Sequence, residues 1–235
     1  MTVTAEKPNT LRVTITHIPA ELKKRHQWVV WKWTRKKGKC DKPPYQTNGR
    51  LADASNPQTW TGIREVEKAY RSGQFDGIGF MLHKDDPFAG IDLDDCRDPD
   101  TGEIEPWALD IIHRVDSYTE VSPSGTGVRI FIRGKLPAGG RKKGNIEMYD
   151  STRYLTITGH VIHHESGVED RQKQIEALHE QIFGTQTHTA NDFNIELQAD
   201  PDIDTEKLRQ LLESSEKAKK TRSEEHTSEL QSQRL

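Results

Sequence analysis

Short strand-like runs joined by turns are the feature that most restricts how this chain can fold. Each run is filled by aromatic, β-branched or otherwise apolar residues, and Gly, Pro, Asn and Asp gather between the runs. The runs cover 27–33, 77–82, 89–93, 118–121, 127–132, 146–149 and 154–158. Apolar periodicity and capping signals predict helices over 61–72, 105–115 and 169–183. Strands that outnumber helices and follow one another through turns predict an α+β domain with a largely antiparallel sheet flanked by helices.

The chain is expected to divide into one folded domain and a polar remainder. Residues 1–184 contain every predicted strand and form the expected domain. Residues 185–202 are polar and aperiodic, which is typical of a linker. Residues 203–221 carry a leucine stripe too short to fold alone, so we expect the start of a truncated helical domain. Residues 222–235 resemble the translated frame of a sequencing adapter and are expected to be a non-native tail.

Composition removes several classes of protein. No run approaches the roughly 20 uncharged apolar residues of a membrane span, and residues 1–8 lack the apolar core of a secretory signal. Cys40 and Cys96 stand alone, without the spacing of a zinc site or a disulfide framework. We therefore expect a cytoplasmic protein without membrane contact.

Charges are segregated along the chain, although the net charge is only −3. Residues 23–50 are strongly basic, residues 85–120 are strongly acidic, and residues 129–143 are basic again. Basic blocks on either side of an acidic block suit a polyanion held around a cation site. A solvated surface of mixed charge is the alternative.

The run GIDLDD at 90–95 carries the sharpest chemical signal. Asp92 and Asp94 are two residues apart on a predicted strand, so they share a face at about 7 Å between Cα atoms. Carboxylates this close repel each other unless a cation lies between them. Their oxygens suit Mg²⁺ or Mn²⁺. The pair predicts a metal site, and two exposed acids at the start of a polar loop are the alternative.

Glu147 is a third candidate acid. It lies between Ile146 and Met148 on another predicted strand and shares its face with neither, so we expect it on the same surface as the aspartate pair. A third acid there would complete a two-metal cradle for in-line attack on phosphorus. A solvent-facing strand glutamate is the alternative.

The sequence SPSGTG at 122–127 is a candidate phosphate-binding loop. Small hydroxyl residues and glycines before a strand expose backbone N–H groups that can cup a phosphate. The hydroxyls of Ser122 and Ser124 add donors, and Arg129 can hold phosphate oxygens in a bidentate manner. The loop does not match the P-loop pattern, because no Gly-Lys-Ser/Thr opens a helix there. An ordinary glycine-rich turn is the alternative.

Two basic segments are candidates for contact with a nucleic-acid backbone. They are the strip at 35–42 and the glycine-containing loop at 134–144, which we expect to be mobile. The individual candidates are Lys36, Lys37, Lys42, Arg141, Lys142 and Lys143. Solvated basic hairpins are the alternative for both segments.

His160, His163 and His164 form a further cluster. Their spacing differs from the His-hydrophobe-His pattern of nicking relaxases, and no tyrosine nucleophile follows them. We expect surface histidines at a strand end.

Taken in order, these motifs resemble a known family. The stretches WVVWKW, DKPPY, GIGFML, GIDLDDC, TEVSPSGTGVRIF, NIEMYD and RYLTITGH are similar to those of phage- and plasmid-borne primase-polymerases of the archaeo-eukaryotic primase superfamily. Together they span residues 27–160. For residues 1–184 the resemblance implies a catalytic domain with a modified core of the RNA-recognition type, in which three acids bind two divalent metals.

The resemblance also assigns roles by position. It makes Asp92 and Asp94 the first metal ligands and Glu147 the third acid. The triphosphate contacts that it implies are Ser122, Ser124, Arg129 and Arg153. The family's second motif usually reads Ser-x-His, whereas this chain has Gly127-Val128-Arg129. Arginine binds phosphate but does not titrate near neutrality as histidine does.

The implied function is a metal-dependent DNA primase and polymerase, a nucleotidyltransferase in the replication of a mobile element. Its implied partners are a single-stranded DNA template, nucleoside triphosphates, Mg²⁺ or Mn²⁺, and a C-terminal helicase domain beyond this chain. A metal-dependent nuclease that uses the same acids is one alternative. A non-catalytic nucleic-acid-binding module is the other, and Arg129 at the position of the family's histidine is the feature that keeps this alternative open.

Overall fold

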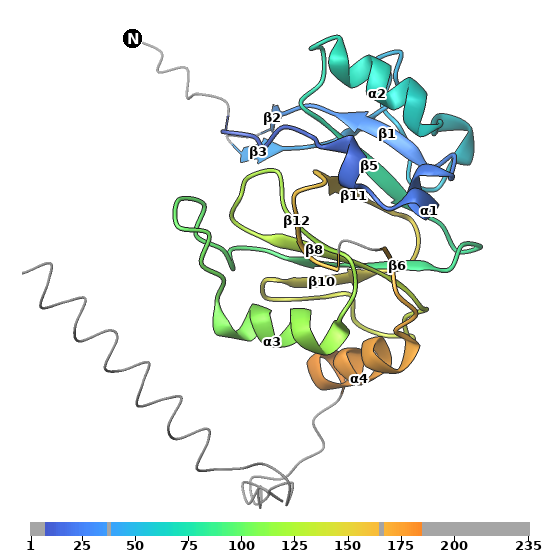
Figure 1. The fold of residues 1–235 in the computed structure, drawn as a ribbon. Coiled ribbons are helices and arrows are strands. Elements are labelled where there is room, and N and C mark those ends of the chain that lie inside the picture. The colour runs from blue at the N-terminus through green and yellow to red at the C-terminus, as the bar shows by residue number, and fades with distance from the viewer. Residues whose placement is uncertain (1–7, 37–38, 165–166, 185–235) are drawn as a thin grey trace, which may run out of the picture. The chain divides into compact units, whose positions relative to one another are not determined.

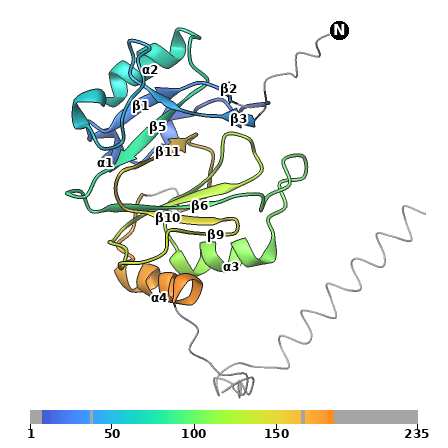
Figure 2. The ribbon, with the colours of Figure 1, turned by 180° about the vertical axis from the view of Figure 1, so that it is seen from behind.

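The computed structural model describes residues 8–36, 39–164 and 167–184. The predicted linker at 185–202, the helical segment at 203–221 and the tail at 222–235 lie outside the described residues. The described elements form four layers, in which two sheets face each other and helices cover their outer sides (Figures 1 and 2). Helix α2 (Ile63–Arg71) covers one sheet, and helices α3 (Pro106–Val115) and α4 (Gln172–Phe183) cover the other.

The smaller of the two sheets has four strands in the order β11-β5-β1-β4. Their bounds are Arg153–Ile157 for β11, Gly77–Leu82 for β5, Trp28–Trp31 for β1 and Pro44–Tyr45 for β4. All the pairs are antiparallel. Trp28 and Leu155 lie opposite Phe80 from the two sides, which places large apolar side chains on one face of the sheet.

The larger sheet has six strands in the order β12-β7-β8-β6-β10-β9, and its pairs are also antiparallel. Their bounds are Val161–His163 for β12, Thr119–Val121 for β7, Val128–Arg133 for β8, Phe88–Leu93 for β6, Ile146–Tyr149 for β10 and Lys142–Lys143 for β9. The prediction of an α+β fold with mainly antiparallel strands is confirmed. The division of the strands between two sheets was not predicted.

Short elements complete the described fold. Strands β2 (Thr34–Lys36) and β3 (Lys39–Asp41) form a separate hairpin within the basic strip at 35–42. A short helix α1 (Ala20–Lys23) and 3₁₀ turns at Ile15–His17 and Pro57–Thr59 lie in the connections. No helix in the described part of the chain is long and apolar enough to cross a bilayer.

Two apolar clusters hold the layers together. One joins side chains of β6, β8 and β10, including Ile91 and Ile130, to side chains of α3 and α4, including Ile175. The other joins the two sheets, where the ring of Phe80 packs against Phe131 with centroids 6.4 Å apart. A Cβ at Gly90 would collide with the Leu155 side chain, so the two sheets approach closely along β6. Strand β6 is therefore fixed from both faces, and so are the acids it carries.

The two cysteines are expected to differ sharply in reactivity. Cys96 is buried and Cys40 is exposed. Burial raises the pKa of the Cys96 thiol from 9.0 to about 11, which lowers its thiolate fraction near neutral pH by about 100-fold. At pH 8 a maleimide should modify Cys40 within minutes and leave Cys96 intact, as peptide mass mapping will show. The matched Cys40→Ser variant should label only after unfolding in urea, and rapid labelling of the native variant would contradict the burial of Cys96.

Candidate active site

A row of charged side chains crosses the six-stranded sheet at one level. The residues that face one another in successive strand pairs are, in order, Glu120, Arg129, Asp92, Glu147 and Lys142. Directly opposed residues of antiparallel strands point to the same face. These five side chains, which we call the charged row, therefore share one face of the sheet.

The charged row faces the four-stranded sheet. Phe131 lies two residues beyond Arg129 on β8, and its ring packs against Phe80 of β5. A cavity of about 390 Å³ lies between the sheets at this level. It is lined by Asp92 and Arg129 on one side and by segments 41–44 and 152–156 on the other. The row therefore opens into a space that can hold a small polar ligand.

The structure places the three predicted acids on one face. Asp92 and Glu147 are directly opposed on β6 and β10, and Asp94 follows Asp92 by two residues. The backbone N–H of Asp94 donates to the carbonyl of Asn145 at 2.9 Å, which extends the pairing beyond the end of β6. Within the described residues, the three carboxylates are not a set whose oxygens all lie within 4.8 Å of one another.

Asp92 and Arg129 form a buried ion pair with unused hydrogen-bonding capacity. Arg129 Nη2 donates to Asp92 Oδ2 at 3.1 Å, and the two side chains are 5% and 13% exposed. Asp92 Oδ1 and the Nε and Nη1 atoms of Arg129 are buried without a hydrogen-bond partner among the described residues. Buried polar atoms of this kind are costly to leave unpaired. The Oδ1 atom of Asp92 is therefore available to bind a cation, and the two N–H groups of Arg129 are available to bind an anion.

The carboxyl group of Asp94 is repelled by the neighbouring acids. Burial raises the pKa of its carboxyl, and the charges of Asp92 and Glu147 raise it further. Lys42 approaches the same group from the other side of the cavity, where burial and then the charge of Arg129 lower its pKa. A divalent cation beside Asp94 would relieve the repulsion among the acids. The donor set therefore fits Mg²⁺ or Mn²⁺, which prefer oxygen ligands.

Glu147 is held by basic neighbours. Its Oε2 accepts hydrogen bonds from Arg153 Nη2 at 2.9 Å and from the Tyr149 hydroxyl at 3.0 Å, and its Oε1 accepts one from Lys142 Nζ. Burial works in the opposite direction, but these hydrogen bonds and the nearby positive charges leave the pKa of Glu147 lowered. The Arg153 guanidinium also lies over the Tyr149 ring at 4.6 Å. The sequence analysis predicts that Lys142 contacts nucleic acid and that Arg153 contacts the triphosphate. In the structure both side chains contact Glu147.

Glu120 is a member of the charged row that sequence reasoning missed. It is fully buried and accepts hydrogen bonds from the Tyr118 hydroxyl at 2.6 Å and from the Thr158 and Gly159 N–H groups at 2.8 Å each. Burial raises its pKa, and the charge of Arg129, which lies opposite, counteracts that rise. The signal in the sequence that could have revealed Glu120 is an acidic residue within the strand-like run at 118–121. Its partner depends on the register of β7 with β8, which the local sequence does not reveal.

The predicted phosphate-binding loop lies against the end of β6. Ser122 Oγ accepts from the Gly127 N–H at 3.1 Å and lies 3.2 Å from Ser124 Oγ, and the Ser122 residue is only 3% exposed. Ser122 therefore stabilises the turn, while Ser124 is half-buried. A Cβ at Gly127 would collide with the carbonyl oxygen of Leu93, the residue between the two aspartates. Glycine at this position allows the loop to reach the acids.

The basic candidates are found in different surroundings. Lys37 and the side chain of Lys36 lie outside the described residues. Lys42 Nζ lies over the Trp33 ring at 4.9 Å. Arg141 donates to the Pro137 carbonyl at 2.9 Å, and Lys143 Nζ donates to the Ile182 carbonyl of α4 at 2.7 Å. The loop at 134–144, which we expected to be mobile, is therefore linked to helix α4 by the hydrogen bond of Lys143.

Comparison with known proteins supports the resemblance drawn from the motifs. No protein-family model matches the chain. The sequence is 38% identical over 156 residues to the DNA primase-polymerase of Nitratiruptor phage NrS-1, an alignment that covers 63% of this chain. The match spans 21% of that protein's length. The expected resemblance to phage primase-polymerases is confirmed at the level of sequence.

Proposed function

We propose that this chain carries the catalytic domain of a DNA primase-polymerase that makes and extends primers on a single-stranded template. The observation that supports this most directly is the charged row. It sets Asp92 opposite Glu147 and beside Arg129, whose Nε and Nη1 have no hydrogen-bond partner among the described residues, and Asp92 and Arg129 line one cavity. Similarity to a phage DNA primase-polymerase supports the same chemistry. Acids for a metal and an arginine for phosphate are what transfer of a nucleotide requires.

Asp92, Asp94 and Glu147 would hold the divalent metal. The fit rests on the unpaired Oδ1 of Asp92 and on the raised pKa of Asp94. When bound, Mg²⁺ or Mn²⁺ supplies charge stabilisation at the reacting phosphorus and lowers the pKa of the attacking hydroxyl.

Arg129 is the group that we propose to bind the triphosphate. Its buried Nε and Nη1 atoms have no partner among the described residues, and its Nη2 is fixed by Asp92. An arginine held in this way needs little reorganisation to form a bidentate contact with phosphate oxygens. Ser124 and the half-exposed Arg153 would extend the contact along the triphosphate tail.

The template would lie along the basic hairpin and Lys42. Strand β3 ends at Asp41, which is the first residue of the cavity-lining segment 41–44, and Trp33 offers an aromatic ring beside Lys42. Backbone contacts from lysines combined with stacking on aromatic rings are the usual way of holding a single strand without reading its sequence.

A strand-length assay tests the proposal. The 235-residue chain is incubated with single-stranded DNA and Mg²⁺ or Mn²⁺, with and without labelled nucleoside triphosphates. We expect template-dependent products that lengthen only when triphosphates are present. Strands that shorten without triphosphates would establish the nuclease alternative. Binding of DNA without any change in length under either metal would establish the non-catalytic module that Arg129 keeps open.

A further inference from the structure

Three potential metal-ligating side chains meet on the face of the six-stranded sheet opposite to the charged row. Asp116 caps the C-terminal end of α3, His163 ends β12 and His164 follows it. His163 pairs with Thr119, which precedes Glu120 on β7 and therefore points to the other face. The sequence analysis expects this cluster to be surface histidines at a strand end, because nothing local links it to Asp116.

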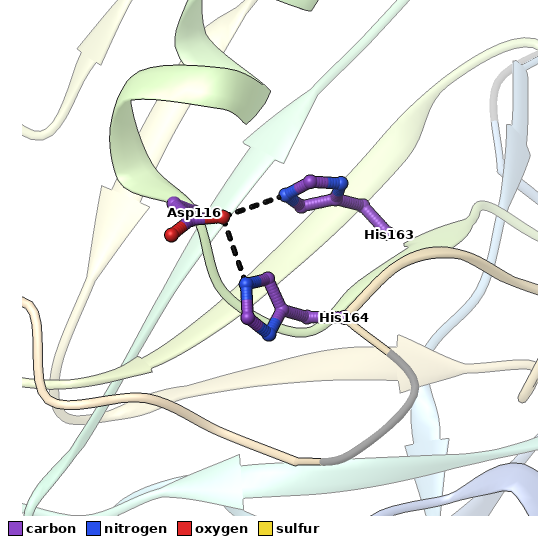
Figure 3. Close-up of side chains that lie close together, drawn as sticks. All are labelled: Asp116, His163 and His164. Atoms are coloured by element: carbon purple, nitrogen blue, oxygen red, sulfur yellow. Dashed lines mark hydrogen bonds and ion pairs between the residues drawn. The ribbon is translucent and has the colours of Figure 1, made fainter.

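Both imidazole rings are directed at one carboxylate oxygen. His163 Nε2 lies 2.9 Å and His164 Nε2 lies 2.8 Å from Asp116 Oδ1, as Figure 3 shows. The ligand atoms of the three side chains all lie within 4.8 Å of one another. Ligand atoms around one Zn²⁺, at bonds of about 2.0–2.2 Å, lie roughly 3–4 Å apart. Small side-chain rotations would therefore admit an ion among them.

Neighbouring residues hold the carboxylate in place. Arg171 Nη2 donates to Asp116 Oδ2 at 3.0 Å, and Arg171 Nε donates to the Asp116 carbonyl at 2.9 Å. The second oxygen is thus anchored while Oδ1 is directed to the histidines.

The histidines are also arranged as ligands. Glu169 Oε1 lies 4.0 Å from His164 Nδ1, so a carboxylate stands near the ring nitrogen that would carry the proton if Nε2 held an ion. Asp116 and His164 both have positive φ angles, of 50° and 53°. Asp and His are among the residues that adopt this conformation most often after glycine, and at Asp116 it is the C-cap of α3.

We propose that Asp116, His163 and His164 bind one transition-metal ion of the Zn²⁺ class. Imidazole nitrogens favour Zn²⁺ over Mg²⁺, so this site and the all-oxygen site of Asp92 and Asp94 should select different ions. The three side chains are between 26% and 45% exposed, which leaves a coordination position for water. The ion would tie the end of α3 to the edge strand β12. The competing interpretation is that the histidines only donate hydrogen bonds to the carboxylate.

Metal retention and Co²⁺ spectroscopy test the proposal. Chelator-treated protein is dialysed against Zn²⁺ and analysed by mass spectrometry of the metal, and a parallel sample is titrated with Co²⁺. We expect the double variant His163→Gln/His164→Gln to retain one equivalent of zinc less than the parent chain. Its affinity for Co²⁺ should fall by at least about 100-fold, with loss of the visible absorption of a low-coordinate Co²⁺ site.

Two control variants separate this site from others. His160→Gln removes a nearby histidine whose Nε2 contacts the Arg12 carbonyl, and it should retain zinc as the parent chain does. Asp92→Asn/Asp94→Asn should also retain this equivalent, because its ligands lie on the other face. Equal retention by the parent chain and the double histidine variant would overturn the proposal. Absence of a Co²⁺ band in the parent chain would overturn it as well, whether or not the variant folds.

Discussion

Asp94→Asn is expected to lower nucleotide incorporation by at least about 10³-fold, which corresponds to about 4 kcal/mol of transition-state stabilisation, without weakening the fold. No side-chain hydrogen bond of Asp94 is found among the described residues, and burial together with its acidic neighbours raises its pKa. Neutralising it removes repulsion from the folded state and removes a metal ligand from the proposed site. Activity should therefore fall while the free energy of unfolding stays equal or rises.

Primer extension and urea denaturation on the same samples check this expectation. Asp92→Ala/Asp94→Ala should abolish incorporation and leave binding of single-stranded DNA intact. Asp110→Asn is the matched control, since Asp110 is exposed on α3 and, within the described part of the chain, its ion-pair partner is Arg114 at 3.2 Å. Normal incorporation by Asp94→Asn would remove the acids from the proposed chemistry.

Glu120→Ala should destabilise the domain by about 3–5 kcal/mol, because it leaves buried donors without an acceptor. The Tyr118 hydroxyl and the N–H groups of Thr158 and Gly159 all depend on this carboxylate. Tyr118 directly precedes β7, and Thr158 and Gly159 directly follow β11, so the loss should loosen the link between the two sheets. Urea denaturation monitored by tryptophan fluorescence measures the change.

Glu67→Ala is the matched control for Glu120→Ala. Glu67 pairs with Arg71 one helical turn away on the surface of α2 at 2.7 Å, and such exposed pairs contribute less than about 1 kcal/mol. A loss of similar size in both variants would mean that water satisfies the donors around Glu120.

The elements of this fold were predicted well where the signal is local. Strand β5 begins at Gly77 and ends at Leu82, the bounds that the apolar run predicts. Spacing by two residues correctly placed Asp92 and Asp94 on one face, and alternation correctly turned Glu147 away from Ile146 and Met148. Each of these inferences uses only the geometry of a single strand.

The remaining features depend on contacts between distant segments. The register of β7 with β8 decides that Glu120 faces Arg129, and no pattern within either strand encodes it. Lys143 looked like a free base because its partner, the Ile182 carbonyl of α4, lies 39 residues away in the chain. Asp116 was hidden as a potential ligand for the same reason, since it lies 47 residues from His163.

Lys142 lies on a strand of two residues at the edge of the larger sheet, whereas its partner Glu147 lies on the next strand inward. The side chain of Lys142 is 59% exposed, whereas its neighbour Lys143 donates a hydrogen bond to the Ile182 carbonyl of α4. A change of the Lys142 rotamer alone would therefore release one oxygen of Glu147 without moving the edge strand or Asp92 on β6. In this arrangement Glu147 can exchange Lys142 for another cation when a single side chain at the edge of the sheet moves. The ionic partner of this acid can therefore change while the backbone of the domain stays where it is.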